Sequence, residues 1–150
     1  MTSINVCASK AILCKYMSLG EVLAKAPEII NNNQNQKQTS VCVGWVKDKE
    51  RLFGSPALNN KRNMQWTFNN LTRLIGLTNE EQEQIDKEKM FCLADLKQDD
   101  DAKPYFQSHN EQLYIEQIMG AFLRNLNKNF GDKEERAETI VTYPNFFNQR

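Results

Sequence analysis

The sequence predicts a single domain of mixed α/β class, in which short strands and amphipathic helices share one core. Two observations carry this prediction. Strand-like segments rich in β-branched residues occur near both ends of the chain, and a long helical stripe precedes the last of them. The chain has 150 residues, of which 40% are apolar and 25% charged, as is typical of globular proteins. A chain of this length buries roughly 70% of its unfolded surface when it folds as one domain.

The first third of the chain has the pattern of short strands separated by loops. Residues 4–17 predict two strands joined by a turn of small residues, and residues 28–30 predict a third. Residues 31–38 consist of Asn, Gln and Lys, which predicts a loop with nothing buried. A buried strand is expected over residues 41–46 and its return over residues 51–54.

The middle of the chain predicts two helical segments and the start of a third. Ser55 followed by Pro56 is a helix N-cap with proline at the first helical position. Residues 65–77 predict an amphipathic helix that Gly76 terminates. Thr78 then predicts a new cap, because acidic residues follow it in the first turn.

The last third combines strands with the clearest helix of the sequence. Strands are expected over residues 91–96 and 111–114, separated by the acidic, solvated loop at residues 99–101. From Ile115 onward the apolar residues recur at helical spacing, which predicts a core-facing helix. Residues 139–143 form a final β-branched strand.

The charge balance and the cysteines limit the classes of function. Nineteen basic and nineteen acidic side chains cancel, so neither nucleic acid nor an anionic membrane is expected as a partner. No apolar run approaches the roughly 20 residues that cross a bilayer, and the N-terminus lacks the pattern of a secretory signal. The cysteines share no metal-binding spacing and His109 is the only histidine, so we expect free buried thiols, no zinc and a reducing, cytoplasmic setting. They are Cys7, Cys14, Cys42 and Cys92.

Six segments, in chain order, resemble the first lobe of the nucleotide-binding domain of the DnaK-type 70-kDa heat-shock chaperones, and most of all their large 110-kDa relatives. The segments are Glu28-Ile29-Ile30, Thr39-Ser40-Val41-Cys42-Val43-Gly44-Trp45, Arg51-Leu52-Phe53-Gly54, Asn70-Leu71-Thr72-Arg73-Leu74-Ile75-Gly76-Leu77, Glu116-Gln117-Ile118 and Ile140-Val141-Thr142-Tyr143-Pro144-Asn145-Phe146-Phe147-Asn148. The resemblance implies an actin-like ATPase lobe, with a mixed sheet, flanking helices and a small inserted subdomain. Residues of about 1–38 and 112–150 would form the main subdomain, and about 39–111 the inserted one.

The same resemblance implies a degenerate nucleotide site. In the family, a phosphate loop of sequence D-L-G-T-T follows the first strand, and its aspartate helps to organise the metal. Residues 7–11, Cys7-Ala8-Ser9-Lys10-Ala11, occupy those five positions and match none of them. Glycine allows close approach of a phosphate, whereas Ser9 carries a Cβ, and Cys7 is a poor ligand for a hard cation. Thr72 occupies the position of a family lysine that reaches the phosphates, which leaves Lys10 as the one candidate replacement cation.

The resulting candidate nucleotide-binding positions are Cys7, Ser9, Lys10, Ala11 and Thr72, with no catalytic residue and no metal ligand. Pro144 matches the proline through which relatives transmit the nucleotide state between domains. The pair at residues 146 and 147 is interpreted either as a core plug or as an exposed patch.

We therefore expect a truncated, degenerate chaperone lobe that does not hydrolyse ATP and needs no cofactor. It would act as a protein-binding, regulatory or structural subunit, with another protein chain as partner in a chaperone-related assembly. One alternative is a fragment of an ATP-binding chaperone or nucleotide-exchange co-chaperone that keeps weak binding of ATP or ADP with Mg²⁺. A second is an unrelated α+β enzyme, for which His109 beside Ser108 and Asn110 offers no triad.

Overall fold

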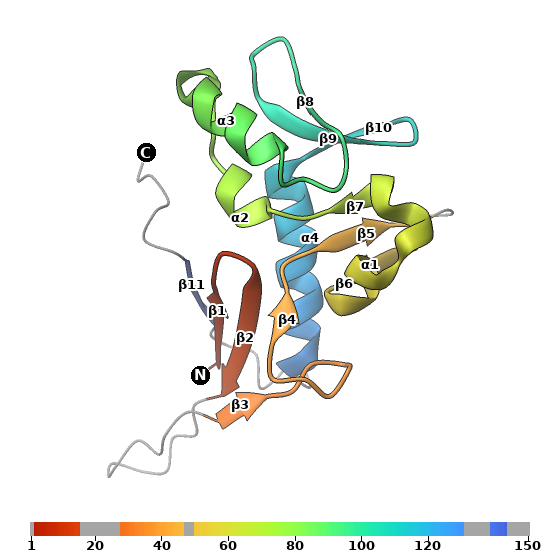
Figure 1. The fold of residues 1–150 in the computed structure, drawn as a ribbon. Helices are drawn as coiled ribbons and strands as arrows, with labels where there is room; N and C mark the ends of the chain where they lie inside the picture. Colours follow the sequence, from red (N-terminus) through yellow and green to blue (C-terminus); the bar gives the residue numbers. More distant parts are fainter. Residues whose placement is uncertain (1, 16–27, 47–49, 131–138, 144–150) are drawn as a thin grey trace.

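The computed structural model describes residues 2–15, 28–46, 50–130 and 139–143, and its elements combine strands and helices as the sequence predicts (Figure 1). The strands are β1 Thr2–Val6, β2 Lys10–Lys15, β3 Glu28–Ile30, β4 Thr39–Ser40, β5 Val43–Trp45, β6 Arg51–Phe53, β7 Thr67–Phe68, β8 Leu96–Gln98, β9 Pro104–Ser108, β10 Glu111–Tyr114 and β11 Thr139–Thr142. The α-helices are α1 Ser55–Asn59, α2 Leu71–Leu74, α3 Gln82–Lys89 and α4 Ile115–Asn127. Short 3₁₀ helices cover Lys61–Trp66, Asn79–Glu81 and Lys128–Phe130. The predicted mixed α/β class is confirmed.

The largest sheet gathers strands from both ends of the described chain. Its order is β11-β1-β2-β3, with β4 paired to β2 as well. β1 and β2 form an antiparallel hairpin in which Val6 lies opposite Ala11, and β11 runs parallel to β1 with Ile4 opposite Val141. The two strands and the turn predicted over residues 4–17 are therefore confirmed.

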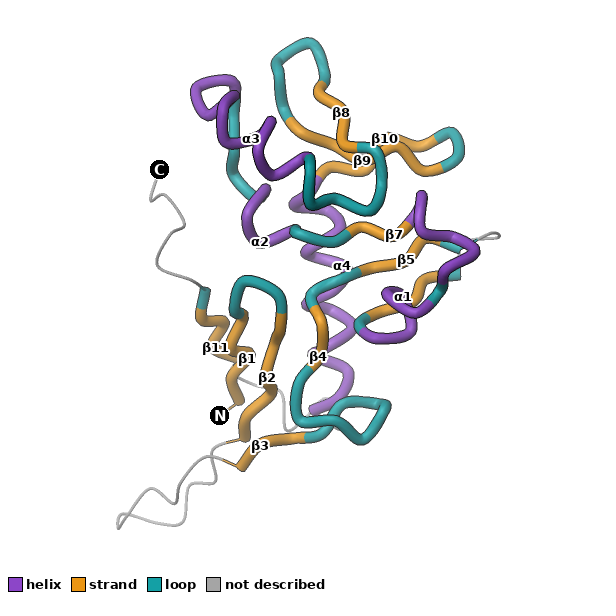
Figure 2. Tube along the Cα trace, viewed as in Figure 1, coloured by secondary structure: helices purple, strands orange, loops and turns teal. Residues whose placement is uncertain are grey.

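Two smaller sheets lie beyond the first one, and Figures 1 and 2 show them beside the upper part of α4. One has the order β6-β5-β7 and the other β10-β9-β8. β5 is buried throughout, and α1 packs so closely on it that a Cβ at Gly44 would lie 3.3 Å from the Cβ of Ala57. Phe68 of β7 and Phe106 of β9 are fully buried and stack with their ring centroids 5.0 Å apart, which joins the two small sheets through the core.

Helix α4 is the longest helix of the described residues, and its predicted apolar stripe is confirmed. Ile118 and Phe122 are fully buried, and Leu126 one turn further on is 1% exposed. The helix begins directly after β10, so the chain passes from sheet to core helix without a loop. The predicted cap at Thr78 is also confirmed, because its N–H donates to Oε2 of Glu81 at 3.0 Å in a capping box.

The helix predicted within residues 65–77 is confirmed only over Leu71–Leu74. Thr67 and Phe68 form β7 instead and pair with β5, and the α-helix is limited to Leu71–Leu74. Asn70 has a φ of 60°, in the left-handed region, so the helix cannot extend back through it. Gly76, with a φ of 76°, follows the helix as the predicted stop.

Several smaller predictions are corrected as well. Residues 91–95 form turns rather than a strand, and β9 lies in a segment without a strand prediction. Asn32 is buried within the polar loop, because its side-chain oxygen accepts hydrogen bonds from the N–H groups of Gln34 and Gln36 at 2.9 Å each. Gly54, with a φ of 72°, caps α1 in place of Ser55, which is the first residue of the helix.

Candidate functional site

The turn between β1 and β2 is the first part of the candidate site. The N–H of Cys7 donates to the carbonyl of Lys10 at 2.7 Å, which closes the turn. The carbonyl of Ser9 accepts from the N–H of Val41 at 2.8 Å, so the turn is fixed to the segment between β4 and β5. The side chains of Cys7, Ser9 and Lys10 are exposed, which corrects the expectation that Cys7 is buried.

Thr72 is the second part of the site, and it bonds to the turn itself. Its side chain is on α2 and the residue is only 1% exposed. The hydroxyl donates to the carbonyl of Ala8 at 2.6 Å, across 64 positions of sequence. The bond is partly buried, and it fixes the turn to α2. Thr72 therefore binds the turn at the position where the resemblance leads us to expect a phosphate-binding lysine.

The start of α2 is held by a polar cluster around Glu88. The side chain of Asn70 donates to Oε2 of Glu88 at 2.8 Å, and Arg73 lies 3.4 Å from Oε1 of the same carboxylate. Glu88 is 9% exposed and lies on α3, so this cluster fixes α2 against α3. Asn69 adds two bonds to the turn after α3, one to the carbonyl of Phe91 and one from the N–H of Leu93, each 2.8 Å long.

An open cavity of about 310 Å³ lies between the turn, the β4–β5 segment and Asn69–Asn70. Its polar lining comes from Ser9, Lys10, Ser40, Asn69 and Asn70. A neighbouring depression of about 370 Å³ shares Lys10 and Ser40 with it. Cys42 also lines the cavity, and burial raises the pKa of its thiol to about 12, which keeps it neutral at physiological pH. Lysine provides the charge of this surface, from Lys10 and, in the neighbouring depression, Lys37.

These residues do not fit the phosphate cradle that the resemblance implies. A triphosphate with Mg²⁺ needs N–H or cationic donors for the phosphates and oxygen ligands for the metal. Two carbonyls of the turn, those of Ala8 and Ser9, already accept protein hydrogen bonds, and the Thr72 hydroxyl is used in one of them. No carboxylate is among the described residues that line either cavity.

The structure brings together three of the five predicted site residues. Ser9 and Lys10 line the cavity, and Thr72 contacts the turn through Ala8. Ala11 is 1% exposed and lines neither cavity, and Cys7 is on the exposed side of the turn. Sequence reasoning missed the lining residues Ser40, Asn69 and Asn70, although two adjacent asparagines before an apolar run are a turn signal. Pro144 and residues 146–147 lie outside the described residues.

Residues 2–15, 28–46, 50–130 and 139–143 contain no helix that is both long and apolar enough to cross a membrane. Over those ranges there is also no group of three or more His, Cys, Asp or Glu side chains arranged to hold a metal ion.

Comparison with known proteins agrees with this fold and with the sequence resemblance. The family model described as "Hsp70 protein" matches residues 15–150. The chain is 27% identical over 124 residues to Chaperone protein DnaK of Burkholderia cenocepacia (strain HI2424), an alignment that covers 81% of this chain and 19% of that protein. It is 29% identical over 142 residues to Hypoxia up-regulated protein 1 of Danio rerio, which covers 90% of this chain and 14% of that protein. The chain therefore spans a fifth or less of the length of these relatives.

The mixed sheets, the core helix α4 and the turn beside α2 define a lobe of the actin-like ATPase class. The family match extends over most of the sequence, from the end of β2 to residue 150. The chain belongs to the Hsp70 protein family, and the resemblance to DnaK-type chaperones and their large relatives is confirmed.

Proposed function

We propose that this chain is a degenerate Hsp70-family lobe that binds another protein and does not hydrolyse ATP. The observation that carries the proposal is the 2.6 Å hydrogen bond from Thr72 to the carbonyl of Ala8. It joins the two segments that would otherwise contact the phosphates, and it uses the one hydroxyl at the lysine position.

The chemistry of phosphoryl transfer explains why these replacements matter. The reaction depends on positioning and on stabilisation of developing negative charge, and the protein contributes little covalent chemistry. Removing one such donor typically costs a few kcal/mol, or about 100-fold or more in rate. Here both the loop residues and the lysine are replaced, so we expect no ATPase activity and no bound cofactor.

A protein partner is supported by the exposed surface of β11. Ile140 and Val141 are 47% and 42% exposed, and Tyr143 just after the strand is 56% exposed. In the order of the sheet, β11 is an end strand, paired with β1 among the described residues. An apolar, β-branched sheet edge of this kind favours burial against another chain.

We also propose the division of the lobe into subdomains and its cellular setting. Residues of about 39–111 would form the inserted subdomain, since β5 to β9 make up most of the two small sheets. Residues of about 1–38 and 112–150 would form the main one. The free thiols of Cys14 and Cys42, buried without a disulfide, support a reducing and hence cytoplasmic setting.

A second candidate function is weak residual binding of ATP or ADP with Mg²⁺ as a fragment of an ATP-binding chaperone or nucleotide-exchange co-chaperone. The open cavity beside Lys10 favours it, because a lysine ammonium can replace the missing phosphate donor.

Thermal unfolding with Mg²⁺ and ATP or ADP separates the two candidates, because a ligand that binds only the native state raises the melting temperature. We expect no shift for the wild-type chain. If only the Thr72→Lys variant shows a shift, the loss of nucleotide binding is due to this one position. A saturable shift in the wild-type chain would overturn the proposal, and Lys10→Gln would then test whether the lysine is the replacement cation.

A further inference from the structure

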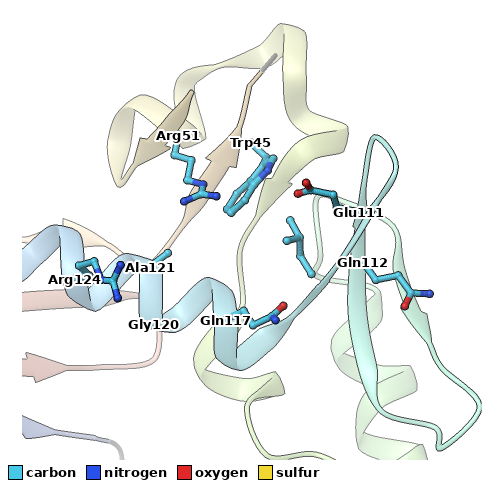
Figure 3. Close-up of a pocket in the computed structure, with 9 residues that line it drawn as sticks. Trp45, Arg51, Glu111, Gln112, Gln117, Gly120, Ala121 and Arg124 are labelled. Carbon is cyan, nitrogen blue, oxygen red and sulfur yellow. The ribbon is translucent and has the colours of Figure 1, made fainter. Parts of the chain in front are cut away.

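A second concave surface lies between β5–β6, β10 and the outer face of α4, and it shares no lining residue with the cavities beside the turn. It encloses about 730 Å³ and is open to solvent (Figure 3). We name it the arginine groove, after Arg51 on one wall and Arg124 on another.

Arg51 is held in a fixed orientation by Trp45. The two residues lie opposite each other in the β5–β6 register, and the guanidinium carbon is 3.9 Å from the centroid of the indole ring. Stacking on the ring leaves the edge of the guanidinium, which carries its N–H donors, free to bind acceptors. Among the described residues Arg51 forms no ion pair, so its donors have no carboxylate partner there.

Helix α4 provides the second wall of the groove, and at Gly120 no side chain covers the helix backbone. Gln117, Gly120, Ala121 and Arg124 lie at helical spacing on the face opposite the core stripe. A Cβ placed at Gly120 would meet no atom within 4 Å, so the groove reaches the helix backbone there. Arg124 is exposed and, within the part of the chain that is described, makes no ion pair.

Strand β10 forms the third wall of the groove. It contributes one apolar side chain, which forms the floor, and one negatively charged side chain. Leu113 is 8% exposed and lines the groove together with the polar residues Glu111 and Gln112. The side-chain oxygen of Gln117 accepts the N–H of Tyr114 at 3.1 Å, which leaves its amide group available as a donor. The groove therefore combines two guanidinium groups, amide donors, an apolar floor and a single carboxylate.

We propose that the arginine groove binds an extended segment of the partner protein that carries acidic side chains. Guanidinium groups bind carboxylates with two parallel hydrogen bonds, and two arginines on separate walls suit two carboxylates spaced along a peptide. The Glu111 carboxylate disfavours a compact polyanion such as phosphate, but it accepts from peptide N–H groups. This inference rests on the proposed protein-binding function and specifies the chemistry of the partner.

The test is the fluorescence anisotropy of a labelled, amidated decapeptide of alternating Glu and Leu, titrated with the purified chain. A peptide with Gln in place of Glu is the matched control for charge. We expect saturable binding of the Glu peptide only, weakened about tenfold or more by Arg51→Gln and by Arg124→Gln. Arg62→Gln is the control variant, since Arg62 is exposed and lies outside the groove, and it should leave binding unchanged.

Gly120→Leu fills the groove without changing its charge. It should weaken binding of the Glu peptide about as much as the loss of one arginine does. Three results would overturn the inference. The Gln peptide could bind as tightly as the Glu peptide, or Arg62→Gln could weaken peptide binding as much as Arg51→Gln does. Inorganic phosphate could also displace the peptide at a concentration equal to that of the peptide. If the peptide does not bind and nucleotide does not raise the melting temperature, the proposed role of the groove is wrong, but the proposal of a non-catalytic lobe stands. A nucleotide shift would instead count against the proposed function.

Discussion

Helix α4 and the turn between β1 and β2 differ in what their residues do. Around α4, the side chains at the predicted apolar positions are buried, as Ile118 and Phe122 are, and they connect the helix to the sheets. At the turn between β1 and β2, exposed Cys7, Ser9 and Lys10 occupy positions for which the resemblance implies a phosphate loop. Burial around α4 stabilises the fold, whereas the three exposed side chains of the turn contribute little to the core. The comparison indicates that the core does not depend on the exposed side chains of the turn.

Phe122→Ala should have the largest effect on stability, because the ring is fully buried on α4. Loss of a buried phenyl ring and the cavity left behind typically cost about 3–5 kcal/mol of the free energy of unfolding. Ser9→Ala, at an exposed position of the turn, should change it by less than about 0.5 kcal/mol. Urea unfolding of both variants measures the difference, and equal losses would contradict the comparison.

The rate of cysteine alkylation should also differ between the exposed turn and the buried core. Burial raises the pKa of Cys42 to about 12, so about one thiol in ten thousand is ionised there at pH 8, whereas Cys7 is exposed. Iodoacetamide at pH 8 should alkylate Cys7 at least about 100-fold faster than Cys42, as measured by peptide mass spectrometry over time. A Cys7→Ser variant should lose the fast phase, and rapid labelling of Cys42 would mean that the core opens.

The same pKa shift predicts how stability changes in alkali. The Cys42 thiol has its ordinary pKa, 9.0, in the unfolded chain and a raised one in the folded chain. Its contribution to stability is fully present below about pH 9 and is lost as the pH rises toward 12, because the unfolded state ionises first. A Cys42→Ala variant should show a smaller loss of melting temperature over this range.

Thr72→Val tests the hydrogen bond that joins α2 to the turn. The substitution keeps the shape of the side chain and removes the donor to the carbonyl of Ala8. The expected loss is about 1 kcal/mol, because the carbonyl lies next to an open cavity where water replaces part of the bond. Thr72→Ser keeps the hydroxyl and should retain most of the stability. A larger loss in Thr72→Ser than in Thr72→Val would mean that the methyl contact, and not the hydrogen bond, holds α2 to the turn.

The predicted elements that were confirmed are those whose local pattern and tertiary environment agree. The stripe of α4 buries the residues that its helical spacing selects, and the hairpin of β1 and β2 forms in the segment whose apolar residues and small-residue turn predict it. The helix predicted within residues 65–77 is shorter than expected, because Phe68 is buried through pairing of β7 with β5, a contact that helical spacing cannot reveal. Asn70 in the left-handed region then begins the helix late.

The candidate site was predictable in its location but not in its contacts. The resemblance identified the turn and Thr72 as neighbours, and the structure places them in contact. It did not reveal that Thr72 bonds to Ala8, since that bond depends on how α2 is anchored by Asn70 and Glu88. The arginine groove was missed entirely, because Trp45, Arg51 and Arg124 come from separate elements and match no motif.

Gly120→Ala should have the smallest effect and the opposite sign. Gly120 lies within α4, where glycine costs roughly 0.5–1 kcal/mol relative to alanine because of its greater freedom in the unfolded chain. The added methyl group meets no atom within 4 Å, so no clash offsets this gain, and the free energy of unfolding should rise by about 0.5–1 kcal/mol. Ala121, its neighbour on the same wall, provides the reverse control, since Ala121→Gly should cost a similar amount. If Gly120→Ala instead destabilised the lobe, the backbone there would have to be closed off by other atoms, and the open wall of the groove would be refuted together with the prediction.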